Sequence, residues 1–451
     1  MSRNRLIVIS ADAMEDVDEA YAATLPYFGR LLKSPARAQI ESVYPTLTYP
    51  NHTAQITGCR PATSGIFNNV LMQPGIDHPD WFWYYDMIRV SSILDAAAAD
   101  GRSIAAVDWP ATAGAPFEVV IPEIGNEDRT GGEDATMASV CSPRGYQLWL
   151  RHRDLIGPRP KRNHGAFAAA VAADVLREDR PDVLMLHLVE LDSARHKFGP
   201  RGAHVAEALR TIDSRLQVVL EALEDAGTTD QTNIVIVSDH GQLDVVQHTN
   251  LNVLLAQRGL LEVDENHRLV RWDAYLHSSG LSGQLFCAED ISAQKRRQLE
   301  DLLDEIVADP AYRIRKVWTA AEARESFGLD GPFDYVVESD PGVIVGGALD
   351  RRVIVRRGDP DFGGTLGNHG HHPGAGDQPV FFATGPDFVS GADAGRHSMI
   401  DEAATFAAVL GVDLPSCEGT AMSELLATGE SAGRVTGSPK VSAVDLAPLA
   451  S

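Results

Sequence analysis

Five short apolar runs constrain the fold of this 451-residue chain more than any other feature. Because they lack the apolar-polar alternation of a half-exposed strand, they predict strands buried on both faces of a parallel sheet. The runs are LIVIS (6–10), SIAAV (103–107), VLMLHLV (183–189), NIVIV (233–237) and PVFFAT (379–384). Helical patterns lie between them, and the longest runs from Val205 to Leu223 and stops at Gly227. This alternation predicts an α/β fold whose doubly wound, mainly parallel sheet is flanked by helices.

Two regions interrupt the rhythm and suggest the domain organisation. Residues 1–245 and 366–427 are predicted to form the core, with an irregular excursion over about 110–165. Residues 246–365 are predicted to form a smaller inserted cap subdomain. It contains a helical stretch from LHSSG to DEIVAD (276–309) and the strand-like segments GVIVGGAL (342–349) and RVIVRR (352–357). The Ser/Gly/Ala-rich end, 428–451, is predicted to be a loosely ordered tail.

Composition narrows the classes of partner. The formal net charge is −24 and the hydrophobic content is 44%. A polyanion would be repelled by such a chain, so we expect neither a polymeric nucleic acid nor an anionic membrane as partner. The apolar run near the N-terminus is too short for a signal peptide or a membrane span, and we therefore expect a cytoplasmic protein. The oligomeric state is left open.

The four cysteines are far apart in the sequence and lack any metal-binding spacing, so we expect reduced, structural thiols. They are Cys59, Cys141, Cys287 and Cys417.

The segment TLTYPNHTAQITG (46–58) predicts a short helix that begins at Thr48. Pro50 suits the first turn, where its missing N–H is not needed, and Gly58 suits the end. Thr48 would then lie among unpaired N–H groups at the positive end of the helix dipole, a setting that favours an anion such as phosphate. The alternative is that Thr48 only caps the helix.

Acidic and imidazole side chains follow three of the predicted strands. Asp12 follows the first strand, Asp192 and His196 follow VLMLHLV, and the pair Asp239 and His240 follows NIVIV. The carboxyl ends of parallel strands meet at one edge of a sheet, where ligands bind. Three carboxylates would repel one another there unless cations lay among them. Carboxylates mixed with imidazoles suit Zn²⁺ first, with Mn²⁺ or Fe²⁺ as alternatives.

A glycine-rich loop, GNHGHHPG (367–374), adds His369, His371 and His372. It could fold over the edge of the sheet and supply a last ligand. The alternatives are a solvated polar loop or an adventitious metal binder.

These residues resemble a known family: the alkaline phosphatase superfamily and, within it, the nucleotide pyrophosphatase/phosphodiesterase group. The matching motifs follow the family order and span residues 12 to 370. They are SADAM, PTLTYPNH, GCRPATSGI, DSARHKFGP, SDHG and GNHG. The resemblance implies an alkaline-phosphatase-like core and a hydrolase that cleaves phosphodiester or phosphoanhydride bonds through a covalent phosphothreonine.

The same resemblance implies two zinc ions per chain and a role for each site residue. Thr48 would be the nucleophile, Asn51 would hydrogen-bond a non-bridging phosphoryl oxygen, and Tyr49 would stack against a leaving-group base. One metal would be held by Asp12, Asp239 and His240 and would also contact Thr48; the other would be held by Asp192, His196 and His369.

Charge counting bears on the substrate. Two divalent cations, three carboxylates and an ionised threonine leave the centre near neutral, which suits a monoanionic phosphodiester better than a dianionic monoester. The basic run at 151–164 could supply an arginine clamp, but a solvated loop is the preferred interpretation. His371, His372 and Pro373 replace the aromatic-Asp-Asn sequence of nucleotide-cleaving relatives, so the substrate stays broad: a small phosphodiester, a nucleotide or a phosphonate.

Two other functions compete with phosphodiester hydrolysis. The first is hydrolysis of a phosphonate C–P bond on the same site, as in phosphonoacetate hydrolases. The second is a non-catalytic, zinc-stabilised binding protein. Sulfatases and cofactor-independent phosphoglycerate mutases are disfavoured because a threonine stands at the nucleophile position.

Overall fold

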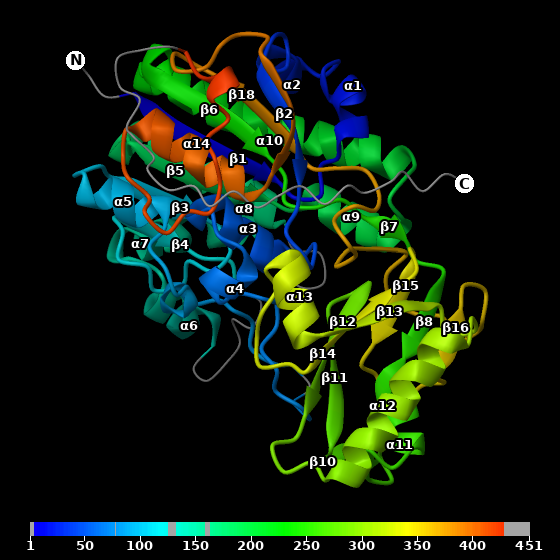
Figure 1. The fold of residues 1–451 in the computed structure, drawn as a ribbon. Coiled ribbons are helices and arrows are strands. Elements are labelled where there is room, and N and C mark those ends of the chain that lie inside the picture. Colours follow the sequence, from blue (N-terminus) through cyan, green and yellow to red (C-terminus); the bar gives the residue numbers. More distant parts are fainter. Residues whose placement is uncertain (1–3, 77, 125–131, 158–162, 428–451) are drawn as a thin grey trace.

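The computed structural model describes residues 4–76, 78–124, 132–157 and 163–427. The predicted tail, 428–451, lies outside the described residues. Figure 1 shows a larger part built around one long sheet and a smaller part, drawn in green and yellow, beside it.

The larger part contains an eight-stranded sheet in the order β19-β2-β18-β6-β1-β5-β3-β4. In that order the strands are β19 (Asp393–Ser398), β2 (Ala36–Glu41), β18 (Val380–Thr384), β6 (Thr232–Val237), β1 (Arg5–Ala11), β5 (Val183–Leu188), β3 (Ile104–Val107) and β4 (Val119–Ile121). Strands β6, β1, β5, β3 and β4 pair in parallel, which confirms the predicted mainly parallel α/β fold.

One strand runs against the prediction. PVFFAT forms β18, but this strand is antiparallel to both of its neighbours, β6 and β2. A fully apolar run is compatible with either direction, because burial on both faces looks the same in sequence. The direction is set by the chain connection, which returns to the sheet from the smaller part.

Helices cover both faces of the sheet. Along β1, Ile7 and Ile9 lie in one core cluster and Leu6 and Val8 in the other, as expected for side chains that alternate across a strand. The first cluster includes residues of α8 (His164–Asp174) and α10 (Ala203–Ala226). The second includes residues of α3 (Thr48–Thr57), α5 (Ile93–Ala99) and α14 (Ile400–Leu410). Helix α10 ends at Gly227 in the left-handed conformation (φ 67°), as predicted.

The smaller part has its own sheets and its own core cluster. An antiparallel four-stranded sheet contains β11 (Ala274–Ser278), β12 (Ser282–Cys287), β14 (Tyr335–Ser339) and β13 (Ile314–Thr319). A second sheet pairs β8 (Gln247–Asn250) with β15 (Val343–Gly346) and β16 (Ile354–Arg356). Leucines of α11 (Leu251–Gln257) and α12 (Ala293–Ala308) fill the core between them. Other buried residues of this part, such as Phe286, Phe333 and Val336, belong to the first core cluster of the larger part, so the inserted cap stays a prediction.

The helical stretch predicted at 276–309 was wrong over its first half. Only α12 is helical there; β11 and β12 precede it and form a hairpin around Gly280, whose φ is 73°. Leu281 and Leu285 are four residues apart, a spacing that suits one face of a helix or of a strand, and pairing with β14 decides between the two.

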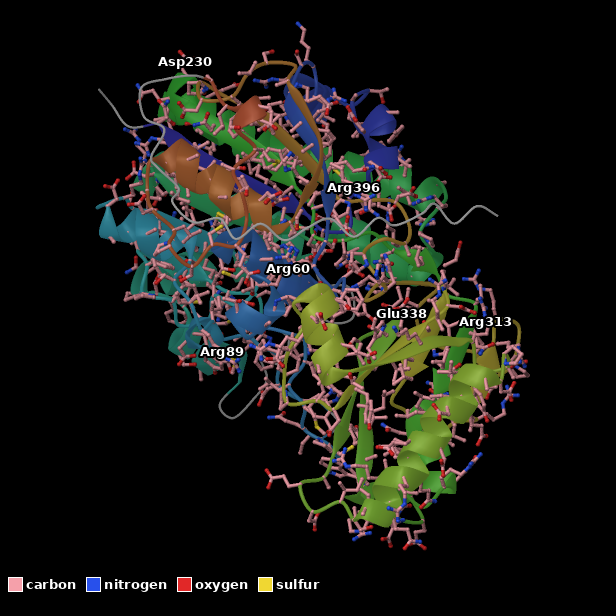
Figure 2. The ribbon with its side chains drawn as sticks, viewed as in Figure 1. Arg60, Arg89, Asp230, Arg313, Glu338 and Arg396 are labelled. Carbon is pink, nitrogen blue, oxygen red and sulfur yellow. The ribbon has the colours of Figure 1, made fainter. Side chains whose placement is uncertain are left out.

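The remaining elements connect these layers. They are α1 (Glu19–Ala22), α2 (Pro26–Leu31), α4 (Pro61–Ser64), α6 (Glu133–Val140), α7 (Pro143–His152), α9 (Glu190–Phe198), β7 (Leu243–Asp244), β9 (Leu261–Val263), β10 (Leu269–Trp272), α13 (Ala320–Phe327) and β17 (Gly367–Asn368). Arg60, labelled in Figure 2, marks where the two parts meet: the N–H of Ala62 donates to the carbonyl of Gly328 at 2.7 Å.

Among the described helices, we find none that is both long and apolar enough to cross a membrane.

A buried ionic network connects α9 to the residues that follow β1. The guanidinium of Arg195 is fully buried and donates to both carboxylate oxygens of Asp18, at 2.6 and 2.8 Å. It also lies 2.5 Å from Glu15, whose carboxylate accepts the N–H of Gln242 at 2.8 Å. Arg201 reaches the same glutamate from a half-exposed position.

We predict that Arg195→Met lowers the free energy of unfolding by about 3–5 kcal/mol, because it leaves two buried carboxylates without their main counterion. The matched change Arg201→Met should cost about 1 kcal/mol or less, since its guanidinium is half exposed and Arg195 still compensates Glu15. Urea unfolding of the two variants measures the difference. Equal losses would show that burial of Arg195 is not what makes the network stabilising.

Candidate two-metal site

Six polar residues converge at the carboxyl ends of three neighbouring strands. Asp12 follows β1, Asp239 and His240 follow β6, and α9 after β5 carries two more. The structure brings them into two groups: Asp12, Asp239 and His240, and Asp192, His196 and His369. Within each group the potential ligand atoms lie within 4.8 Å of one another. These are the two ligand sets that the sequence predicted.

The first group is buried and electrostatically frustrated. His240 Nε2 lies 3.2 Å from Asp239 Oδ2 and 3.5 Å from Asp12 Oδ1. Burial raises the pKa of both carboxyl groups, and each is raised further by neighbouring carboxylates. Burial and nearby histidines lower the pKa of His240, so the imidazole favours its neutral, metal-ligating form. Among the described residues, no donor hydrogen-bonds Asp12 Oδ1 or Asp239 Oδ2.

The second group is oriented by backbone carbonyls. His196 donates from Nδ1 to the Gly367 carbonyl and His369 donates from Nδ1 to the Thr46 carbonyl, both at 2.9 Å. Their Nε2 atoms therefore face Asp192 Oδ1, at 3.2 and 3.9 Å. Burial raises the pKa of Asp192, but His196, His369 and a hydrogen bond from Gln242 together outweigh it and bring the pKa to about 2. Burial lowers the pKa of His369 to about 4.

Both groups fit a divalent cation. Each offers carboxylate oxygen and imidazole nitrogen, the donor types that Zn²⁺ takes readily and that Mn²⁺ or Fe²⁺ also accept. In the first group the two carboxylate oxygens without donors are the atoms that a cation would satisfy. The groups also adjoin each other, since the rings of His240 and His369 stack with centroids 3.7 Å apart.

Thr48 lies beside the first group. Helix α3 begins at Thr48 and ends before Gly58 (φ 66°), as predicted, with Leu47 in the capping position. The Thr48 hydroxyl therefore does not cap the helix; its oxygen lies 3.3 Å from His240 Nε2. As the first helical residue, Thr48 lies at the positive end of the helix dipole, which favours an anion. The geometry argues against the purely capping alternative.

Asn51 does not occupy the position expected for it. Its side chain is fully buried, and Oδ1 accepts the N–H of Val43 at 2.8 Å while Nδ2 donates to the carbonyls of Leu47 and Pro45 at 2.8 and 3.2 Å. The amide is used to hold the turn that precedes α3. With both ends of the amide bonded to main chain, Asn51 is not among the residues that line the cavity at Thr48.

Asn69 lines that cavity instead. Its Oδ1 accepts the N–H of Tyr49 at 2.8 Å, which fixes the amide and leaves Nδ2 as its donor. The sequence analysis missed this residue because it belongs to an irregular loop without periodicity. The available signal was its place in the IFNN run (66–69), which begins at the last residue of the GCRPATSGI motif.

A cavity of about 320 Å³ opens over both groups. Tyr49 and Trp81 form an aromatic wall, with ring centroids 5.5 Å apart in an edge-to-face arrangement. Stacking of Tyr49 on a base stays a prediction. Among the described residues, the lining includes no lysine or arginine. It consists of Asp12, Thr48, Tyr49, Asn69, Trp81, Asp108, Glu123, Ile124, His164, Val189, Asp192, Ser193, His196 and His369.

Three further predicted candidates lie elsewhere. His371 is buried outside both ligand groups, and His372 packs against Tyr44 and Phe327 with ring centroids 5.8 and 5.3 Å away. In the basic run, Arg151 pairs with Asp174 and Glu178, and residues 158–162 lie outside the described part of the chain.

The fold and the site together define an α/β protein that gathers two acid-imidazole groups and a helix-start threonine at one edge of its sheet. The family model of the type I phosphodiesterase / nucleotide pyrophosphatase matches residues 6–350, and the chain belongs to this family.

Relatives agree with this assignment. The chain is 23% identical over 235 residues to ectonucleotide pyrophosphatase/phosphodiesterase family member 3 of Bos taurus and to family member 1 of Homo sapiens. These alignments cover 49% of this chain but only 23% and 21% of the relatives, so the match spans less than a quarter of their length. A venom phosphodiesterase of Macrovipera lebetinus is similar to the same extent over 24% of its length.

Solved structures share the fold. Human ectonucleotide pyrophosphatase/phosphodiesterase 5 superposes with a TM-score of 0.66 at 18% identity, covering 94% of this chain and 100% of that one. The murine protein, in an inactive threonine-to-alanine form in complex with AMP, gives 0.65 at 17% identity with the same coverage.

We predict that His196→Ala or His369→Ala lowers bound zinc from two ions per chain toward one, because each removes an imidazole from the second group only. His372→Ala is the matched control from the same loop and should retain both ions. Elemental analysis after dialysis against limiting chelator gives the stoichiometry. Two ions retained in both test variants would remove these histidines from the ligand set, and a loss in His372→Ala would indicate a different site.

Proposed function

We propose that the protein hydrolyses small phosphodiesters or phosphoanhydrides, such as nucleotides, through a covalent phosphothreonine on Thr48. The observation that carries this proposal is the place of the Thr48 oxygen: at the start of α3, 3.3 Å from His240 and beside two adjoining ligand groups. Membership in the phosphodiesterase family supports it. So does the murine neighbour, which is inactive as a threonine-to-alanine form and is in complex with AMP.

The ligand sets would hold two divalent cations, with Zn²⁺ the preferred identity: Asp12, Asp239 and His240 for one and Asp192, His196 and His369 for the other. When bound, such cations supply Lewis acidity that favours ionisation of an alcohol or water and stabilises the attacking and leaving oxygens of an in-line displacement.

The chain's own residues perform the remaining work. Thr48 Oγ forms a bond to phosphorus while the bond from phosphorus to the leaving-group oxygen breaks, and water later hydrolyses the phosphothreonine. Asn69 Nδ2 donates to a non-bridging oxygen, because Oδ1 is already engaged by Tyr49. The positive end of the α3 dipole adds positive potential at the same place. The wall of Tyr49 and Trp81 would receive an organic substituent of the substrate.

Charge balance favours a diester. The three ligand carboxylates and an ionised Thr48 balance two divalent cations, and no lysine or arginine lines the cavity among the described residues. A dianionic monoester would need additional positive charge there.

One comparison of substrates tests the reaction class. The purified protein is assayed in parallel with bis(p-nitrophenyl) phosphate, a nucleotide diester and phosphonoacetate. We expect turnover of the diesters. Fast turnover of phosphonoacetate alone would favour the phosphonate hydrolase, and zinc binding without turnover of any substrate would favour the binding protein.

We predict that Thr48→Ala lowers kcat by about 10³-fold or more, because no hydroxyl remains to form the intermediate. Bound zinc should stay nearly unchanged, because Asp12, Asp239 and His240 remain to hold the ion that Thr48 would also contact. Thr48→Ser retains the oxygen and is the control expected to keep measurable turnover and a trappable phosphoprotein. Turnover of Thr48→Ala at the wild-type rate would contradict the nucleophile assignment.

We also predict that an asparagine-to-aspartate change lowers activity at position 69 but lowers stability at position 51. Asn69→Asp keeps the acceptor for Tyr49 but loses the Nδ2 donor, so kcat/KM should fall by about 10²–10³-fold with little change in unfolding free energy. Asn51→Asp loses two buried hydrogen bonds from Nδ2 and should cost about 1–3 kcal/mol of stability. Steady-state kinetics and urea unfolding measure both. The assignment fails if Asn69→Asp is fully active.

A further inference from the structure

His187 lies next to the first ligand group but belongs to neither group. It is the fifth residue of β5, it is buried, and it pairs in register with Ser10 of β1, two residues before Asp12. Its Nε2 is 3.0 Å from Asp12 Oδ2 and its Nδ1 is 3.1 Å from the main-chain carbonyl of Asp108. This polar side chain of an otherwise apolar strand therefore connects the residue that follows β1 with the residue that follows β3.

The two oxygens of Asp12 have different surroundings. Oδ2 contacts His187, whereas Oδ1 faces His240 and accepts no hydrogen bond from the described residues. The main chain of Asp12 is also fixed, because its N–H donates to the Leu188 carbonyl at 3.0 Å. With one oxygen held and the backbone anchored, the other oxygen has one direction available, into the first group.

The imidazole of His187 is itself held in place. The ring of His52 meets it edge-on with centroids 4.5 Å apart, and Trp109 backs His52 at 4.8 Å. The carbonyl of Asp108 is the hydrogen-bond acceptor for His187 Nδ1. Asp108 has a left-handed backbone (φ 55°), a conformation that aspartate tolerates better than most residues. A side chain supported this closely can determine the orientation of its partner.

We propose that His187 is a positioning residue for Asp12: its Nε2 proton holds Oδ2, so that Oδ1 is presented to a divalent cation in the first ligand group. The proposal rests on the proposed function, which assigns Asp12 to that group. An ionised carboxylate and a main-chain carbonyl both only accept hydrogen bonds, so Nε2 must carry a proton to hold Asp12, and Nδ1 a second proton to hold Asp108 at the same time.

Replacing His187 by glutamine or by asparagine distinguishes the positioning role from a purely structural role. The amide nitrogen of glutamine reproduces the reach of histidine Nε2, and that of asparagine reproduces the reach of Nδ1. His187→Gln therefore keeps the donor to Asp12 and loses the bond to Asp108, whereas His187→Asn does the reverse. If His187 only satisfied a buried carbonyl, asparagine would be the better replacement.

The test measures zinc affinity by competition with a chromogenic chelator, in the full chain and in a His369→Ala background that weakens the second group. We expect His187→Asn to bind the first-group ion about 10- to 100-fold more weakly and His187→Gln to lose much less. Thermal unfolding of the two variants in excess chelator controls for folding, since both amides remove the same ring.

Two results would overturn the inference. Equal zinc affinities in His187→Asn and His187→Gln, or the tighter binding in the asparagine variant, would show that the contact with Asp12 does not set the affinity. A wild-type chain that binds no zinc would overturn the proposed metal sites themselves and the positioning role with them. If the wild-type chain binds two ions and the two variants do not differ in zinc affinity, only the positioning role is overturned and the proposed metal sites stand.

Discussion

Repulsion among three clustered carboxylates, two of them buried, is the constraint on which the rest of this structure depends. Asp12, Asp192 and Asp239 lie together because β1, β5 and β6 are adjacent and parallel, so that all three strands end at the same edge. Burial and mutual repulsion raise the pKa values of Asp12 and Asp239, whereas Asp192 is stabilised as a carboxylate by His196. Such a centre needs either protons or cations, and the imidazoles around it are placed to share cations.

The scaffold around the centre keeps these groups in fixed orientations. Gln242 donates to Asp192 at 2.5 Å, and its own N–H is held by Glu15 of the Arg195 network. Thr46, two residues before Thr48, accepts from His369 through its carbonyl and from Gly370 through its hydroxyl. The turn that presents the proposed nucleophile therefore also orients His369. Separate chain segments are coupled in this way, since moving one would move donors of the other.

Much of the site could be predicted from the sequence because its residues follow strands or stand in compact motifs. Asp12, Asp239 and His240 come directly after apolar runs, and the helix start at Thr48 is marked by Pro50 and Gly58. Asn51 was placed in the site by the family resemblance. In the structure its amide instead bonds the main chain before α3, so neither end of the amide is available to the cavity. Asn69 gave only a weak local signal, the IFNN run, and His187 gave none, since their roles come from neighbours that the fold supplies.

The sequence by itself determined the α/β class, the parallel core strands and the five acidic and imidazole residues that follow them, because strand burial and the common edge of parallel strands are local and topological rules; the family resemblance added His369. Only the tertiary structure decided the direction of β18, the hairpin of β11 and β12, and which asparagine lines the cavity at Thr48. In each of these cases the residues suit two local conformations or two partners equally well. Long-range pairing and packing then select one of them, and no short stretch of sequence contains that information.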